Sequence, residues 1–201
     1  MHVLMLADLS EPSSRALTAA RALGARGHEV EVLAPDRGEP AGPPVSLVPE
    51  HPPVISSWDQ VAGSLQRDLA LLERGLRRAQ EVAFDVLDAR GWRAAYAAAG
   101  LREAFGLPIV ASLDALRRIE RRGRRWTRGD DLIEQTERWL ASIAAAVVVR
   151  SGTAARAFPD GADVDVVAGT GAGERHAERL EGIYAKAIAR ARRPVHAVAR
   201  A

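Results

Sequence analysis

The sequence predicts an α/β fold with one Rossmann-like, doubly wound parallel sheet and helices on both of its faces. Two short apolar runs, 85–87 and 109–111, flank an alanine-rich helical segment, 91–105. Strand, helix and strand at this spacing form a βαβ unit, which places the two strands parallel. The first run of the chain, 2–8, is continuously apolar up to Asp8, as expected for a strand buried on both faces.

The first 34 residues repeat the same order of elements. After the strand at 2–8, Ser10 is a plausible N-cap and Pro12 fits the first turn of a helix that ends at Gly27. A second strand follows at 28–34. The beginning of the chain is therefore a second βαβ unit.

The middle segment, 35–53, holds seven of the chain's 11 prolines and is predicted to be a loop with a short strand at 45–48. Ser56 or Ser57 then caps a long helix that runs to about Ala83. Its core face is predicted from helical spacing and consists of Val61, Leu65, Leu69, Leu72 and Leu76.

The remaining elements continue the alternation of helices and strands. Asp130 or Asp131 is predicted to cap a helix that feeds a strand at 146–149, and another strand lies at 164–167. The glycine-rich junction 169–173 leads into a last helix. Residues 1–170 are assigned to the Rossmann-like domain and 174–193 to a C-terminal helix of the same domain, whose apolar side carries Leu180, Ile183, Tyr184, Ala187 and Ile188.

Composition excludes several classes of protein. The absence of cysteine excludes disulfides and thiolate metal sites. The longest apolar run, 143–149, is too short to cross a bilayer. The first ten residues lack the basic region of a signal peptide, so we expect the chain in the cytoplasm. No metal and no cofactor is predicted, because no His/Asp spacing supports a metal site.

Arginine dominates the basic residues, since Lys186 is the only lysine among 28 basic side chains. The stretch 116–128, with Trp126, is a candidate contact for an anionic acceptor, for lipid head groups at a membrane surface, or for RNA. Nucleic acid is the least favoured, because no nucleic-acid-binding module accompanies it. The alternative is a solvated loop. The arginines are Arg117, Arg118, Arg121, Arg122, Arg124, Arg125 and Arg128.

Aspartates stand at or near the ends of three predicted strands. Because the carboxyl ends of parallel strands meet at one edge, Asp8, Asp88 and Asp114 are predicted to face one crevice. Such an acidic cleft could bind hydroxyl groups or a cation. The alternative is that these carboxylates cap helices or contact solvent.

The order of the pieces resembles the N-terminal, acceptor-side domain of the family 4 glycosyltransferases of the GT-B fold. The resemblance covers most of residues 1–170 and rests on five segments in the family's order. They are LTAARALGARGHEVEVLAP, FDVLDARGW, GLPIVASLD, ERWLASIAAAVVVRS and VDVVAGTGAG.

This resemblance implies a retaining transfer of sugar from a nucleotide-sugar, in a cleft between two Rossmann-like domains. The second, nucleotide-binding domain is missing after VDVVAGTGAG. The last helix then resembles the family's C-terminal helix, which crosses back onto the first domain. The alternative is an unrelated helix.

The chain also departs from the family's functional residues. The first loop reads Glu-Pro-Ser-Ser at 11–14, where the family has a glycine pair that approaches the donor phosphate. The positions matching the family's histidines hold other side chains, and no catalytic residue is assigned. The acceptor-side cleft candidates are Asp8, Ser13, Ser14, Asp88, Arg90, Trp92 and Asp114.

Three functions follow as hypotheses. The first is a domain that is inactive alone and acts as a partner or regulatory subunit of a glycosyltransferase, as a homodimer or with a glycosyltransferase chain. The second is the acceptor-binding half of a split retaining enzyme, with Ser13, Arg90 and Asp114 lining the site. The third is a stand-alone module that binds a small anionic ligand or a membrane surface through the arginine stretch.

Overall fold

The computed structural model describes residues 1–7, 13–35, 45–48, 57–113, 116–123, 125–158, 163–167 and 174–192. Seven parallel strands form one sheet in the order β3-β2-β1-β4-β5-β6-β7. The strands are β1 (His2–Ala7), β2 (Glu29–Pro35), β3 (Val45–Val48), β4 (Val86–Arg90), β5 (Ile109–Leu113), β6 (Ala146–Val149) and β7 (Val164–Val166). This confirms the predicted doubly wound sheet.

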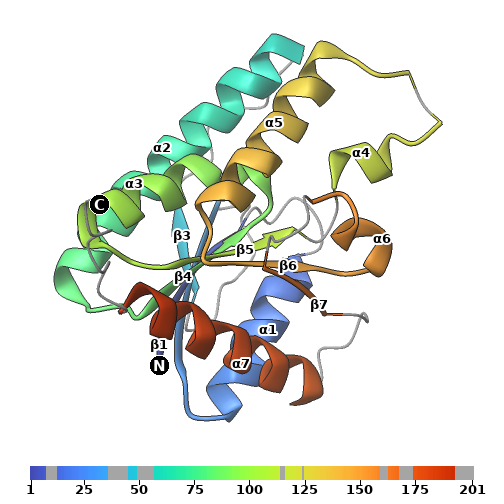
Figure 1. The fold of residues 1–201 in the computed structure, drawn as a ribbon. Coiled ribbons are helices and arrows are strands. Elements are labelled where there is room, and N and C mark those ends of the chain that lie inside the picture. The colour runs from blue at the N-terminus through green and yellow to red at the C-terminus, as the bar shows by residue number, and fades with distance from the viewer. Residues whose placement is uncertain are drawn as a thin grey trace, which may run out of the picture.

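Helices cover both faces of the sheet (Figure 1). On one face lie α2 (Ser57–Glu81), α3 (Ala95–Phe105) and α5 (Arg128–Ile143), and on the other lie α1 (Ser13–Ala25) and α7 (Glu174–Ala191). The short helices η1 (Trp92–Ala94), α4 (Arg117–Glu120) and α6 (Gly152–Ala155) follow β4, β5 and β6. The predicted return of the last helix onto the domain is confirmed, because α7 packs against α1, β4 and β5.

Strand alternation divides the core into two halves. In β1, Leu4 and Leu6 pack beneath α2 and α3, whereas Val3 and Met5 pack toward α1 and α7. Both sets are fully buried, because a parallel sheet covered on both faces has no wet side. The apolar side predicted for the last helix is confirmed in α7, where Tyr184 is the largest fully buried side chain.

The core face of α2 matches the prediction at Leu72 and Leu76, which pack against the core, but not at Leu69. The side chains of Val61 and Leu65 lie outside the described residues. Leu69 is 64% exposed, whereas Leu71 is 1% exposed. The helix turns Asp68 inward instead, and its Oδ1 accepts a hydrogen bond from the backbone N–H of Ala97, in the first turn of α3. A helix N-terminus carries unpaired N–H groups, so this buried carboxylate satisfies one of them. The leucine spacing alone could not reveal that demand.

Two glycines allow α2 and α3 to approach closely. A Cβ atom built on Gly100 would lie 2.7 Å from Cδ1 of Leu72, and one built on Gly75 would lie 2.7 Å from Cδ1 of Leu101. These distances are shorter than a carbon–carbon contact. Each helix therefore seats a leucine of the other against a residue that has no side chain.

We expect Gly100→Ala to destabilise the fold by about 1–2 kcal/mol, because overpacking at Leu72 outweighs the gain in helix propensity. Gly182→Ala is the matched control, since nothing lies within 4 Å of the added Cβ in the middle of α7. That control should stabilise the fold by about 0.5–1 kcal/mol. Urea unfolding monitored by circular dichroism measures both, and equal gains in the two variants would contradict the packing argument.

Candidate functional site

The strand order reverses between β1 and β4, which is the topological switch point of the sheet. Ligands of open α/β sheets bind outside the carboxyl ends of the strands at such a point. Alternation along β4 places Asp88 and Arg90 on the same face as Val86, which packs with the α7 side of the core. Ser112 lies on β5 directly opposite Arg90.

A buried polar network joins these residues to α7. The carboxylate of Asp88 accepts hydrogen bonds from the Ser112 hydroxyl at 2.6 Å, the Tyr184 hydroxyl at 2.7 Å and Nε of Arg90 at 2.8 Å. Nη2 of Arg90 also lies 2.7 Å from the same carboxylate. The side chain of Asp88 is 0% exposed, and that of Arg90 is 11% exposed. A buried carboxylate requires such partners, because desolvation without them is costly.

The network leaves Tyr184 as a proton donor. Burial, and then the negative charge of Asp88, raise the pKa of the Tyr184 phenol well above its usual value. Its O–H therefore stays protonated and donates to the carboxylate. The sequence predicted that Asp88 faces an open crevice. In the structure this side chain is buried and ties α7 to β4 from the interior of the fold.

The other cleft candidates have different surroundings. Trp92 begins η1 just beyond β4, half-buried, with the guanidinium of Arg93 5.0 Å from its ring centroid. Ser13 and Ser14 start α1, and their side chains lie outside the described part of the chain. Asp8 and Asp114 also lie outside the described residues, so the prediction that they face one crevice together with Asp88 stays a prediction.

The arginine stretch folds into α4, a turn and the start of α5. Asp130 is the buried centre of this corner: Arg117 Nε donates to its carboxylate at 2.6 Å, and Arg121 Nη2 donates at 3.2 Å. The Thr127 hydroxyl and then its N–H hold the pKa of the Asp130 carboxyl well below its usual range, despite burial. The corner is thus held together by charge-assisted hydrogen bonds.

The cap of α5 differs from the prediction. Thr127, not Asp130 or Asp131, is the N-cap, and its side chain accepts from the N–H of Asp130. Asp130 is the third helical residue, and its carboxylate accepts from the N–H of Thr127, which completes a capping box. Arg124, within the same stretch, lies outside the described residues.

A second buried carboxylate supports α4 from below. Both side-chain oxygens of Glu137 accept from the backbone N–H of Arg117 at 3.1 Å. Burial, with added repulsion from Glu120 and Glu134, raises the pKa of Glu137 to about 7, although the Arg117 N–H opposes that shift. Sequence patterns did not point to Glu137, because an acidic residue within an amphipathic helix is ordinarily solvated.

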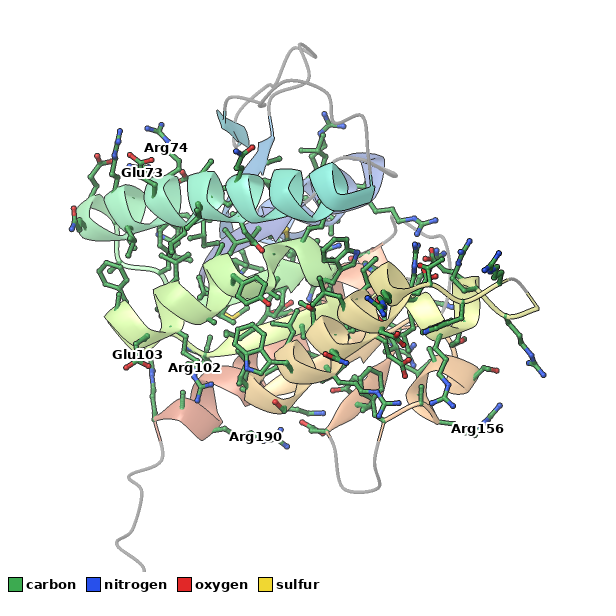
Figure 2. All side chains as sticks on the ribbon, turned by 90° about the horizontal axis from the view of Figure 1, so that it is seen from above. Glu73, Arg74, Arg102, Glu103, Arg156 and Arg190 are labelled. Carbon is green, nitrogen blue, oxygen red and sulfur yellow. The ribbon has the colours of Figure 1, made fainter. Side chains whose placement is uncertain are left out.

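An open hollow of about 490 Å³ lies between α4 and α5. In Figure 2, nitrogen-tipped side chains gather around α4 and the start of α5. We call this feature the arginine hollow. Its lining residues are Arg118, Arg121, Arg122, Trp126, Glu134 and Arg138. Three of these arginines belong to the predicted set, whereas Arg138 and Glu134 come from the facing side of α5, which the sequence did not assign to the site.

Other predicted anion contacts lie outside this hollow. Arg117 is directed to Asp130, and Arg125 and Arg128 are exposed without a recorded ion pair to any described residue. Within the described ranges, no group of three or more histidine, aspartate or glutamate side chains could hold a metal ion. No described helix has both the length and the apolar character required to span a bilayer.

The doubly wound parallel sheet, with a last helix that returns to it, has the fold of one half of solved GT-B glycosyltransferases. Solved structures share this architecture. A sucrose-phosphate synthase chain from Thermosynechococcus elongatus superposes with a TM-score of 0.67 at 14% identity, covering 92% of this chain and 98% of that one. The sequence profile of Glycosyltransferase Family 4 matches residues 13–167. The chain belongs to this family.

Longer relatives are matched over about half their length. A second sucrose-phosphate synthase chain from the same organism gives a TM-score of 0.69 at 12% identity, covering 84% of this chain and 48% of that one. MurG from Acinetobacter baumannii gives a TM-score of 0.54 at 14% identity, covering 85% of this chain and 46% of the MurG chain. A search of curated proteins finds no match to the sequence. At these identities the structural likeness describes the fold.

Proposed function

We propose that this chain is a glycosyltransferase-like acceptor-side domain that is inactive alone and serves as a partner or regulatory subunit of a glycosyltransferase. The observation that carries this proposal is the network around Asp88. Asp88 and Arg90 stand at positions that resemble the family's histidines, and the Asp88 carboxylate accepts hydrogen bonds from Arg90, Ser112 and Tyr184. A carboxylate that is fully buried and engaged by three donors is closed off from a reacting sugar.

The connection between β7 and α7 supports the same proposal. Only residues 168–173 join the end of the described β7 segment to the start of α7, so no second Rossmann-like domain is inserted there. The chain also matches one sucrose-phosphate synthase chain over 98% of its length and a longer one over only 48%. The half-domain and its returning helix thus form one continuous unit, and a donor site would have to come from another polypeptide segment.

The test is recovery of the tagged chain from its own organism under mild conditions, with mass spectrometry of co-eluting proteins and a nucleotide-sugar turnover assay. We expect no turnover by the isolated chain. We expect a co-eluting glycosyltransferase whose turnover changes when the chain is removed and is restored when it is added back. Turnover by the isolated chain, or an inactive homodimer or monomer without such a protein, would contradict the subunit role.

The same assay separates a subunit from a split enzyme. In a split enzyme, this chain lines the acceptor site, and Asp114→Asn should reduce turnover of the reconstituted complex to background without releasing the partner. For a regulatory subunit, the variant should leave the partner's own turnover in place. Arg74→Gln is the matched surface control, because Arg74 projects from the outer side of α2 (Figure 2).

A further inference from the structure

The arginine hollow combines positive charge with an aromatic wall. We propose that it binds a phosphate-bearing ligand, a phosphate ester or a diphosphate, through the guanidinium groups of Arg118, Arg122 and Arg138. This inference stands apart from the subunit role, because it concerns a surface between α4 and α5 rather than the buried network around Asp88. Its volume of about 490 Å³ is that of a small-molecule site.

Charge is unbalanced within the lining of the hollow. Four guanidinium groups line the hollow with one carboxylate, Glu134, and one of the four, Arg121, is also paired with Asp130. Glu134 is shared, since it lies 2.7 Å from Nη2 of Arg138 and 3.6 Å from Nη1 of Arg118. Arg122 has no recorded ion pair to any described residue and faces the same space. The lining therefore attracts an anion that carries more than one negative charge.

Stability does not explain this convergence of arginines. Arg118 is 64% exposed and Arg138 is 56% exposed. Exposed ion pairs contribute about 0–1 kcal/mol, which does not repay holding several like charges together. The arrangement instead resembles a binding surface whose counter-charge is supplied from outside.

The walls of the hollow are held in place by hydrogen bonds to neighbouring groups. Arg121 donates to Asp130 and also to the backbone carbonyl of Arg125 at 2.9 Å, so its guanidinium is fixed. The indole N–H of Trp126 donates to Asp131 at 2.6 Å, which fixes the ring as one side of the lining. Pre-ordered walls lower the entropy cost of binding.

The ligand class follows from the donors. Guanidinium groups are planar forks that match the oxygens of phosphate, and they are more weakly hydrated than lysine ammonium groups. The exposed Trp126 ring offers an apolar surface for the group esterified to the phosphate. A lipid head group and a soluble phosphate ester share this chemistry, and the experiment distinguishes them.

The first arm is calorimetric titration of the full chain with pyrophosphate in low salt. We expect saturable binding that weakens as salt increases. Arg118→Gln with Arg122→Gln should weaken it roughly tenfold or more, since each substitution removes charge-assisted hydrogen bonds. The matched control is Arg74→Gln with Arg175→Gln, which removes the same charge from α2 and α7. Equal losses in the two double variants would overturn the site.

A second variant tests the proposal in the opposite direction. Glu134→Gln removes the one carboxylate among the described lining residues and should tighten pyrophosphate binding. Unchanged or weaker pyrophosphate binding in Glu134→Gln, with normal thermal unfolding, would overturn the proposal. The proposal would also be overturned if the wild type showed no saturable binding either to pyrophosphate or to the vesicles described below.

The second arm uses vesicles that contain phosphatidic acid in place of pyrophosphate, and it measures binding by co-sedimentation of the chain with the vesicles. Loss of vesicle binding in the Arg118→Gln, Arg122→Gln variant, without pyrophosphate binding by the wild type, assigns the site to a lipid head group. Loss of pyrophosphate binding without vesicle binding assigns it to a soluble phosphate. Vesicle binding that survives in this variant overturns the role of the hollow at the membrane.

Discussion

Asp88→Ala is expected to destabilise the fold by about 3–5 kcal/mol, the largest effect of any single substitution considered for this chain. The change removes the acceptor of three hydrogen bonds and leaves Arg90 buried without its carboxylate. An unpaired buried charge costs far more than the pair itself contributes. Urea unfolding should show a lower midpoint.

Tyr184→Phe separates the helix contact from the charge. It removes only the hydroxyl that donates to Asp88 at 2.7 Å and should cost about 1.5–3 kcal/mol, as for a hydrogen bond to a charged group. In the double variant, the two losses should not add, because they share one interaction. Full additivity, or a loss below about 1 kcal/mol in Asp88→Ala, would mean that the network does not hold α7 in place.

Glu137→Gln should change how stability depends on pH. Burial raises the pKa of Glu137 from 4.5 to about 7, so the folded state holds this proton more tightly than the unfolded state. The free energy of unfolding of the wild type therefore loses a contribution of about 3 kcal/mol as pH rises from about 4.5 to above 7. Glutamine does not titrate, so the free energy of unfolding of the variant does not lose this contribution.

The measurement is the difference in unfolding free energy between Glu137→Gln and wild type at pH 5 and at pH 8. We expect the unfolding free energy of the variant to rise relative to that of the wild type at the higher pH, because the two proteins differ only at Glu137. Glu103→Gln, on the exposed side of α3, is the matched surface control (Figure 2). A difference that is the same at both pH values would show that Glu137 titrates normally.

The sheet and most element boundaries could be predicted from the sequence, because apolar runs and turn residues are local signals. The helix stop at Gly106 is one example, since its left-handed φ of 67° suits glycine. The strand at 146–149 and the helix at 174–191 also match the prediction closely. These features depend on neighbours in the chain, which are all visible in the sequence.

The polar contacts could not be predicted, because they depend on partners far apart in the chain. The buried state of Asp88 depends on Tyr184, which is 96 residues away. The leucine spacing predicted Leu69 in the core, whereas Asp68 faces the core instead. The reason lies in the first turn of α3, where the N–H of Ala97 needs an acceptor. Likewise Asp130 looks like a cap until Thr127 is seen to share the capping box and two arginines to share the carboxylate.

The contact between Asp88 and α7 also has a consequence for synthesis of the chain. Domains fold progressively from the N-terminus while the ribosome adds about 5–20 residues per second. The central strands emerge well before Tyr184, so the carboxylate in β4 lacks its phenol partner and the α7 side of Val86 and Val110 stays wet. The nascent sheet therefore keeps this apolar surface exposed to solvent until α7 has been synthesised and docks on it.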